Sequence, residues 1–416
     1  MSDPVTSSRV DRIATRLQRR YAAERRFKAL GLVAVLFSAL VLAFLLVTMT
    51  ANALGGFKRA ELRFPIDFTT GVMTVDPAQL EGPNAMQVLE GAGLKDVVAF
   101  SASQALGDAG AAEVPDGAWR DVAADLIDDP SRLTGTMQAS VPASDDLASA
   151  LRGDGQPQLR ALADQLVKQG KLVTAIDWGF LSRGDATGPQ DVGIWGALKG
   201  SMLTMLVTLL LAFPIGVLAA VYLEEYAPKN RWTDIIEVSI NNLAAVPSII
   251  FGLLGLAVFL AIFPNYRSAP LIGGMTLALM TMPVIVISGR NAIKAVPPSI
   301  RDAALAVGAS RVQTVFHHVL PLALPGILTG TIIGMARALG ETAPLLMIGM
   351  RAFVASPPEG FTSPATVLPV QIFLWSDEID RGFVERTSAA IIVLLLFLLV
   401  MNGLAIYLRN RFEKRW

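Results

Sequence analysis

The sequence predicts an all-α membrane protein with six transmembrane helices and a small α+β domain inserted after the first of them. The 416-residue chain is 53% hydrophobic and only 17% charged, with a mean hydropathy of +0.51, whereas about a quarter of the residues of a soluble protein are charged. Six apolar runs are long enough to cross a bilayer, which takes ~20 residues, and one long polar stretch follows the first. The runs lie at 29–51, 195–222, 236–263, 270–289, 322–350 and 386–408.

The first run, 29–51, is predicted to be a membrane anchor rather than a signal peptide. Its apolar core is longer than the ~7–15 residues of a typical signal sequence. The preceding tail, 1–28, is strongly basic, and basic residues favour the cytoplasmic side of a membrane. The basic residues of this tail are Arg9, Arg12, Arg16, Arg19, Arg20, Arg25, Arg26 and Lys28.

The C-terminal tail, 409–416, is basic as well. It carries Arg409, Arg411, Lys414 and Arg415. The positive-inside rule therefore places both termini in the cytoplasm, and six crossings, an even number, require the same arrangement. On this topology the segments 223–235 and 290–321 are cytoplasmic, and 52–190 lies on the outer side.

The outer stretch at 52–190 is polar, acidic and long enough to form a domain. The runs AELRFPIDF and KLVTAIDWGF predict strands, whereas DLASALRG and QLRALADQLVKQG predict helices. We therefore expect a small α+β domain, without a recognisable catalytic motif. The five later runs form a helical core at 191–408.

Composition and motifs argue against several classes of function. A net charge of +0 argues against nucleic acid as the main partner. The chain has no cysteine and only two adjacent histidines, His317 and His318, so it offers no thiolate metal site. It contains neither a GxxxxGK[ST] phosphate loop nor a Ser–His constellation within the apolar runs. We expect no catalytic and no metal-binding residue, and hence no enzyme.

Arg337 and Glu341 are out of place in the fifth run, which reads IIGMARALGETAPLL at 332–346. A charge at the bilayer centre costs at least ~3 kcal/mol on insertion scales. Four residues apart on a helix, the two side chains share a face and can pair. On a continuous helix from Leu322, Arg337 lies roughly 22 Å along, near the middle of the membrane. Because the planar donors of Arg match phosphate and carboxylate oxygens, Arg337 is a candidate anion ligand.

The candidate substrate pathway consists of Arg337, Glu341, Thr342 and Ser248. In this hypothesis Arg337 contacts the anion, while Glu341 orients Arg337 and limits how tightly the anion binds. Two alternatives stay open: the pair only fixes helix packing, or it locks the interface with another subunit. The hydroxyl of Thr342 can instead bond to its own helix, and Ser248 has the same ambiguity.

Proline interrupts several of the predicted spans. The positions are Pro214, Pro247, Pro283 and Pro344. Each one alone reads as an ordinary kink, since neighbouring helices or water can satisfy the freed backbone groups. Together they fit a bundle that lines a pathway better than a rigid anchor.

The cytoplasmic segment 290–321 contains a short amphipathic helix. Ser299 is a plausible cap, and an apolar stripe follows it in PPSIRDAALAVG. Gly308 permits a sharp turn before a second short helix, from Arg311 to Leu320, and Pro321 opens the next span. Such a helix either rests on its own bundle or docks to a cytoplasmic partner.

This loop resembles the signature of ABC-importer permeases, E-A-A-x3-G-x9-I-x-L-P. The matching residues are Asp302, Ala303, Ala304, Gly308, Leu320 and Pro321, preceded by Arg301. Asp302 replaces the usual Glu, and His318 stands where Ile is usual. The resemblance implies the ABC importer permease fold, with a coupling loop at 290–321 that inserts into a cleft of a separate ATPase subunit.

Two further segments resemble the phosphate-specific permeases of the PstA type, LAAVPSIIFGLLG at 243–255 and ARALGETAPLL at 336–346. This resemblance implies import of phosphate across the cell inner membrane. The implied partners are a PstC-type second permease, a pair of ATPase subunits that bind ATP and Mg, a periplasmic phosphate-binding protein, and membrane lipid. This chain itself is expected to hold no cofactor. The stretch at 52–190 resembles an extra periplasmic domain of some PstA proteins, of unknown role.

Three other functions remain open on the sequence. A permease for another oxyanion, such as sulfate or molybdate, would share the loop signature, and only the 336–346 segment argues against it. An ion-coupled secondary transporter would show internal inverted repeats, which we do not find. A membrane sensor that binds its ligand through the outer domain would not need the charged pair.

Overall fold

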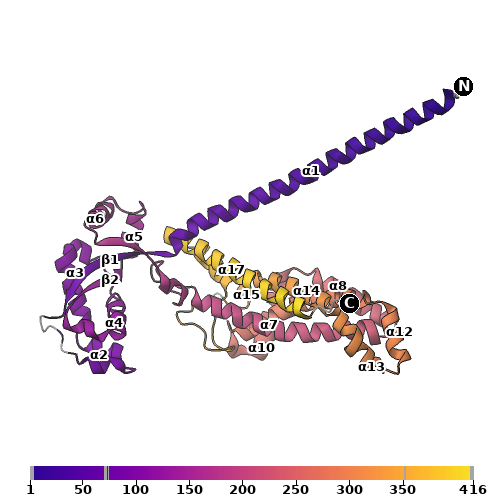
Figure 1. The fold of residues 1–416 in the computed structure, drawn as a ribbon. Coiled ribbons are helices and arrows are strands. Elements are labelled where there is room, and N and C mark those ends of the chain that lie inside the picture. The colour runs from indigo at the N-terminus through magenta and orange to yellow at the C-terminus, as the bar shows by residue number, and fades with distance from the viewer. Residues whose placement is uncertain (1–3, 70–72, 74, 351–352, 413–416) are drawn as a thin grey trace. The chain divides into compact units, whose positions relative to one another are not determined.

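The computed structural model describes residues 4–412 except 70–72, 74 and 351–352, and it is predominantly helical (Figure 1). Side chains are described from Arg20 onward, apart from those of Ala22 and Phe412. By their contacts the residues form two units, Met1–Asn52 and Ala53–Trp416.

The first unit consists of most of helix α1 (Pro4–Gly56). Its segment Ala23–Gly56 is long and apolar enough to cross a membrane. Apart from Ser38, the side chains between Leu30 and Val47 are apolar, and they are exposed all around the helix, as in a helix that faces lipid. In the basic tail Lys28 pairs with Glu24 at 2.6 Å. The predicted basic side chains Arg9, Arg12, Arg16, Arg19, Lys414 and Arg415 lie outside the part of the chain whose side chains are described.

The inserted region contains a three-stranded antiparallel sheet in the order β2-β1-β3. Strand β1 (Lys58–Asp67) lies between β2 (Thr136–Pro142) and β3 (Leu172–Ile176). Leu62, Phe64 and Ile66 alternate along β1 and are fully buried, because successive side chains of a strand point to opposite faces. The predicted strands at both ends of the region are confirmed, while β2 was not anticipated.

Helices complete the core of this α+β domain. Leu89, Leu94, Leu126, Leu147 and Leu166, from five different helices, are buried against the sheet residues. Ser144 caps α5 by accepting a hydrogen bond from Leu147 N. The elements are η1 (Pro77–Glu81), α2 (Ala85–Gly91), α3 (Leu94–Ala111), α4 (Trp119–Asp128), η2 (Pro130–Thr134), α5 (Asp145–Leu151) and α6 (Pro157–Lys168).

The helical core is built around α11. It packs closely against α7 and α14 at small residues: Gly274 lies against Val207 of α7, and Gly330 of α14 lies against Ser288. Such residues let membrane helices approach closely. The elements are η3 (Trp178–Leu181), α7 (Trp195–Val221), η4 (Tyr222–Tyr226), α8 (Arg231–Ala244), α9 (Ser248–Leu254), η5 (Gly255–Phe259), α10 (Leu260–Ile262), η6 (Pro264–Tyr266), α11 (Pro270–Lys294), α12 (Pro298–Ala306), α13 (Arg311–Gln313), η7 (Thr314–Val319), α14 (Leu320–Leu339), α15 (Ala343–Met347), α16 (Leu368–Ser376) and α17 (Arg381–Phe412).

Two predicted spans are not continuous helices. The third, 236–263, is a pair of helices, Arg231–Ala244 and Ser248–Ile262, bent by 104° at the break before Pro247. The fifth, 322–350, is wrong as a single helix, because α14 ends at Leu339 and α15 is a separate short helix. Within the described residues, five single helices have the length and apolar character of a span, and the bent pair brings the number to six. The predicted fold class is confirmed.

Candidate functional site

The break between α14 and α15 holds the charged pair. Arg337 lies in the last turn of α14, and Glu341 lies beyond its end. Arg337 Nε is 3.5 Å from Glu341 Oε1, so the predicted pair is present. The two residues do not share a helical face, contrary to the prediction, since the Glu341 N–H bonds to Ala338 O in a turn after the helix. Pro344 explains the break: it has no N–H to continue the helix, and its ring would clash with the carbonyl of Gly340.

Arg337 is available to a ligand. Its side chain is 50% exposed, whereas that of Glu341 is 19% exposed. The guanidinium is therefore held on one side by a carboxylate and left open on the other. This exposure leaves the guanidinium accessible either to a ligand or to another subunit.

The second break, before Ser248, lies beside the first. Gly252 of α9 packs so tightly on α15 that an added Cβ would lie 2.6 Å from Pro344 Cα. An added Cβ at Gly255 would lie 3.2 Å from Ile348. Because 252 meets 344 and 255 meets 348, the two segments run in the same direction along their contact. Ser248 and Thr342, both half-buried, belong to the N-terminal ends of these two segments.

The hydroxyls of Ser248 and Thr342 have no hydrogen-bond partner in the described part of the chain. Among the residues that the structure describes, the side chains of Ser248 and Thr342 make no hydrogen bond to a protein group, so the alternative in which Thr342 bonds to its own helix is not seen. Both hydroxyls are free to donate to a ligand. The structure thus brings the four predicted pathway residues to two adjacent helix breaks.

The loop at 290–321 has the predicted helix–turn form. Helix α12 begins at Pro298 and is not capped by Ser299, because Pro297 holds the cap position. Gly308 adopts a φ of +88°, which favours glycine. The following helix starts at Arg311 and runs without interruption into α14, so Leu320 and Pro321 lie inside one long helix rather than at a junction.

The exposed side of α12 faces away from the bundle. Asp302 and Ala303 are exposed, Ala304 is buried, and the apolar Leu305 and Val307 are exposed as well. An exposed mixture of apolar and acidic side chains on a short helix is suited to docking on another protein. Arg301 is the exception, because it points inward.

Arg301 ties α12 to the ends of two spans. Its Nη2 donates to Glu225 Oε1 at 2.7 Å, and its Nε donates to the same oxygen at 3.1 Å. It also donates to two carbonyls at the C-terminus of α11, Val296 O at 2.7 Å and Ile293 O at 3.0 Å. One guanidinium therefore joins α12, α11 and η4, which continues α7.

A neighbouring ion-pair group extends this link to α8. Arg290 of α11 pairs with Glu237 of α8 at 2.8 Å and with Glu224 of η4 at 3.4 Å. Lys294 also approaches Glu224, at 3.6 Å. These glutamates were not predicted, although Glu224 lies in the segment 223–235, which was predicted to share a side of the membrane with Arg290, Lys294 and Arg301.

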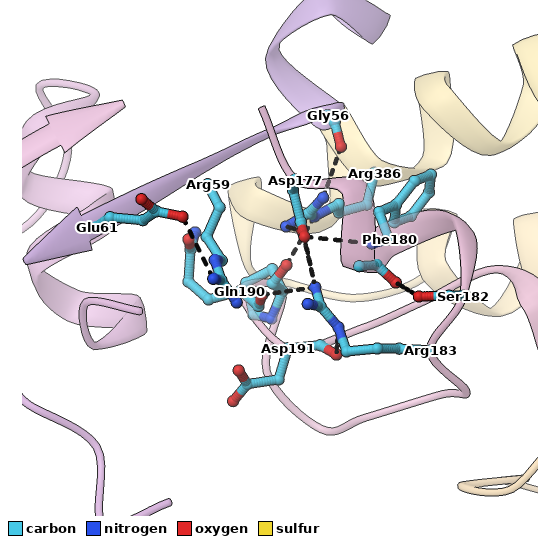
Figure 2. A network of polar contacts seen from close by, with 12 residues as sticks. Gly56, Arg59, Glu61, Asp177, Phe180, Ser182, Arg183, Gln190, Asp191 and Arg386 are labelled. Atoms are coloured by element: carbon cyan, nitrogen blue, oxygen red, sulfur yellow. Dashed lines mark hydrogen bonds and ion pairs between the residues drawn. The ribbon is translucent and has the colours of Figure 1, made fainter. Parts of the chain in front are cut away.

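A second polar cluster, which we call the outer joint, lies where the inserted domain meets the helical core (Figure 2). Its centre is Arg386 of α17, which is almost fully buried. Arg386 donates to Asp177 Oδ2 at 2.9 Å, to Gly56 O at 2.6 Å and to Pro189 O at 2.7 Å. Its guanidinium also lies over the ring of Phe180. The end of α1, the base of the domain and α17 are thus fixed together.

Other contacts reinforce the outer joint. Arg183 forms a second ion pair with Asp177, at 2.7 Å. Trp375 Nε1 donates to Asp185 Oδ1 at 3.3 Å. Burial raises the pKa of Asp185 above its usual 3.8, although the hydrogen bond from Trp375 opposes this shift. Nothing in the sequence analysis pointed to the joint; the only signal was the position of Arg386 at the first residue of an apolar run.

Two family matches divide the chain. Residues 14–161 match a domain of unknown function (DUF3333). Residues 212–415 match the binding-protein-dependent transport system inner membrane component. The first match covers most of the inserted domain, and the second covers most of the helical core.

Curated relatives narrow the family. The "Probable ABC transporter permease protein YqgI" of Bacillus subtilis (strain 168) is 34% identical over 174 residues, 42% of this chain and 59% of the relative. The "Phosphate transport system permease protein PstA 1" of Mycobacterium tuberculosis (strain CDC 1551 / Oshkosh) is 35% identical over 156 residues, 38% of this chain. The chain spans only about half of the length of that second relative, 51%.

Several relatives are matched over most of their length, and one of them serves as an example. It is the "Phosphate transport system permease protein PstA" of Haemophilus influenzae (strain ATCC 51907 / DSM 11121 / KW20 / Rd), 32% identical over 232 residues, 56% of this chain and 81% of the relative. Among solved structures, an inward-facing MetNI methionine ABC transporter shows a TM-score of 0.44 and 18% identity over 53% of this chain and 98% of that chain, which is too distant to bear on function. On the evidence of its sequence relatives, the chain belongs to the PstA-type permeases of binding-protein-dependent ABC transporters.

Proposed function

We propose that this chain is one membrane-spanning subunit of an ATP-driven importer for inorganic phosphate. The observation that carries the proposal is the half-exposed Arg337 at a break in a membrane-spanning segment. A half-exposed Arg at such a position is costly unless anions balance its charge, and Glu341 is a single carboxylate at 3.5 Å. Relatives named as phosphate transport permeases support phosphate as that anion.

The geometry supports a weak, reversible anion site. Arg337 offers planar donors that match two oxygens of phosphate. Glu341 at 3.5 Å offsets part of this positive charge, so the anion binds loosely enough to be released. Ser248 and Thr342 add two free hydroxyl donors. The helix Ser248–Ile262 also begins at a break in a bent span, and the N-terminus of a broken membrane helix favours anions.

The exposed face of α12 would receive the ATPase. In this proposal Asp302, Ala303 and Leu305 contact a cleft on a pair of ATPase subunits, which bind ATP and Mg. Closure of the ATPases would move α12, and the Arg301–Glu225 contact would carry the movement to α7 and α11. The chain contributes the pathway and leaves ATP hydrolysis to its partners.

The remaining partners follow from the family. A PstC-type permease would complete the pathway, and a periplasmic phosphate-binding protein would deliver the anion to its outer mouth. Both termini would lie in the cytoplasm and the inserted domain in the periplasm. This orientation agrees with the basic residues at both ends, of which Lys28 and Arg409 are examples.

Competition for uptake tests the substrate. Cells whose phosphate uptake depends on this chain would take up radioactive phosphate in the presence of excess unlabelled phosphate, sulfate or molybdate. We expect inhibition by unlabelled phosphate alone. Inhibition by sulfate or molybdate to the same extent would favour a general oxyanion permease, and uptake that continues without ATP would favour an ion-coupled carrier.

A further inference from the structure

The base of the inserted domain is held at the level where membrane spans end. Arg386 joins Gly56, the last residue of the span Ala23–Gly56, to Asp177. The backbone of Asp177 also donates to Phe57 O at 2.8 Å. The span Trp195–Tyr226 begins nearby, and the Trp195 N–H bonds to Arg183 O at 3.1 Å. The segment 176–183 is therefore fixed beside the ends of candidate membrane spans, and Figure 2 shows Asp177 and Arg183 next to Gly56 and Arg386.

Apolar side chains point outward from this segment. Ile176 is 60% exposed and Trp178 is 74% exposed, although Asp177 between them is buried. Leu181 is exposed too, and it closes the 3₁₀ helix η3 that begins at Trp178. Residues i and i+3 of a 3₁₀ helix eclipse each other, so Trp178 and Leu181 share a face. We call Ile176, Trp178 and Leu181 the interfacial patch.

We propose that the interfacial patch inserts into the head-group region of the outer leaflet and seats the inserted domain on the membrane. Trp is enriched at this depth because its ring is apolar and its N–H is polar. Lys58 is exposed and pairs in register with Ile176, so a cation lies beside the patch where phospholipid phosphates would be. Insertion of the patch requires only that the spans lie in the membrane, whatever the substrate.

The absence of cysteine makes a direct test possible. The full chain carrying Leu181→Cys would be labelled with the fluorophore NBD and placed in nanodiscs of phosphatidylethanolamine and phosphatidylglycerol. This variant keeps Trp178, and a second label at Ile176→Cys gives an independent position. The control is Phe100→Cys on α3, which is 63% exposed on the same domain but lies outside the outer joint.

Two quenchers distinguish lipid from water. We expect lipids that carry a spin label close to the head group to quench the fluorescence of NBD at 181 and 176. Iodide, which is dissolved in the water, should quench the fluorescence at these two positions only weakly. The label at 100 should behave in the opposite way. Quenching by iodide at 181 and 176, as at 100, would overturn the proposal. Shielding from both quenchers would overturn it as well, because a protein surface would then cover the patch.

Discussion

At the scale of single residues, the buried Arg386 is the residue on which the architecture of the outer side depends most. It satisfies two backbone carbonyls and one carboxylate at once. Breaking a buried ion pair by removing one partner costs about 3–5 kcal/mol. Arg183 still faces Asp177 when Arg386 is removed, so the loss should fall at the low end of that range.

Arg386→Met should therefore lower the stability of the purified chain by about 3 kcal/mol. The matched control is Arg381→Met, on the same helix, where an exposed pair with Asp154 contributes about 1 kcal/mol or less. Thermal unfolding in detergent measures both variants. Equal melting temperatures for the two would show that the outer joint does not hold the fold together.

Asp185 gives a prediction for pH. Because burial raises the pKa of Asp185, the folded protein binds a proton there before the unfolded chain does. The buried charge thus destabilises the fold at neutral pH, and this penalty fades as the pH falls through the raised pKa towards 3.8. Asp185→Asn keeps an acceptor for Trp375 and should be more stable than the wild type at neutral pH. The gap in melting temperature should narrow on acidification, and a constant gap would contradict the assignment.

Sequence could identify the pathway residues but not their geometry. Arg337 and Glu341 stand out because charges are rare in apolar runs. Their four-residue spacing predicted one helical face, yet Pro344 stops the helix between them and the actual contact crosses a turn. Arg386 could not be identified in this way, because an Arg at the end of a span is common. Only the fold shows that Arg386 is buried.

At the scale of elements, the two helix breaks depend on close backbone contact between α9 and α15. Gly252→Ala would place a Cβ 2.6 Å from Pro344 Cα, a backbone atom that cannot move aside cheaply. Overpacking of this kind costs about 1–3 kcal/mol and should shift α15 away from α9. Gly403→Ala on α17 has open space around its Cβ and should be neutral or slightly stabilising. Phosphate uptake and melting temperature should both fall for the first variant alone.

The link between α12 and the spans gives a second prediction at this scale. Arg301→Gln should weaken the connection to Glu225 and to the end of α11 while leaving the exposed docking face of α12 intact. The complex should then hydrolyse more ATP for each phosphate imported. Arg311→Gln, at an exposed site on α13, is the control. An unchanged ratio of ATP hydrolysed to phosphate imported would show that Arg301 has no part in coupling.

Apolar length alone predicts spans and overlooks their interruptions. The fifth run stays apolar on both sides of Gly340, so its length indicated a continuous helix to 350. Pro247 and Pro344 marked the two breaks, but a proline in a membrane helix is compatible with a mere kink. Whether a proline causes a kink or a full break depends on packing between segments that are distant in the sequence, here Gly252 on Pro344. A single sequence does not reveal that packing.

At the scale of the whole molecule, composition and the coupling-loop spacing predicted the fold class and the family. The strand pattern of β1 predicted the sheet of the inserted domain because its buried residues alternate from Leu62 to Ile66. The attachment of this domain could not be predicted, since the outer joint brings together Gly56, Asp177 and Arg386 from three separate parts of the chain.

The central claim is that Arg337 binds phosphate in an ATP-driven import pathway. The most direct measurement is phosphate accumulation in proteoliposomes that contain the complete complex, with either wild-type chain or Arg337→Gln, and with ATP supplied to the ATPase side. We predict that the variant assembles and hydrolyses ATP but accumulates little phosphate. Accumulation at the wild-type rate by a fully assembled Arg337→Gln complex would contradict the account.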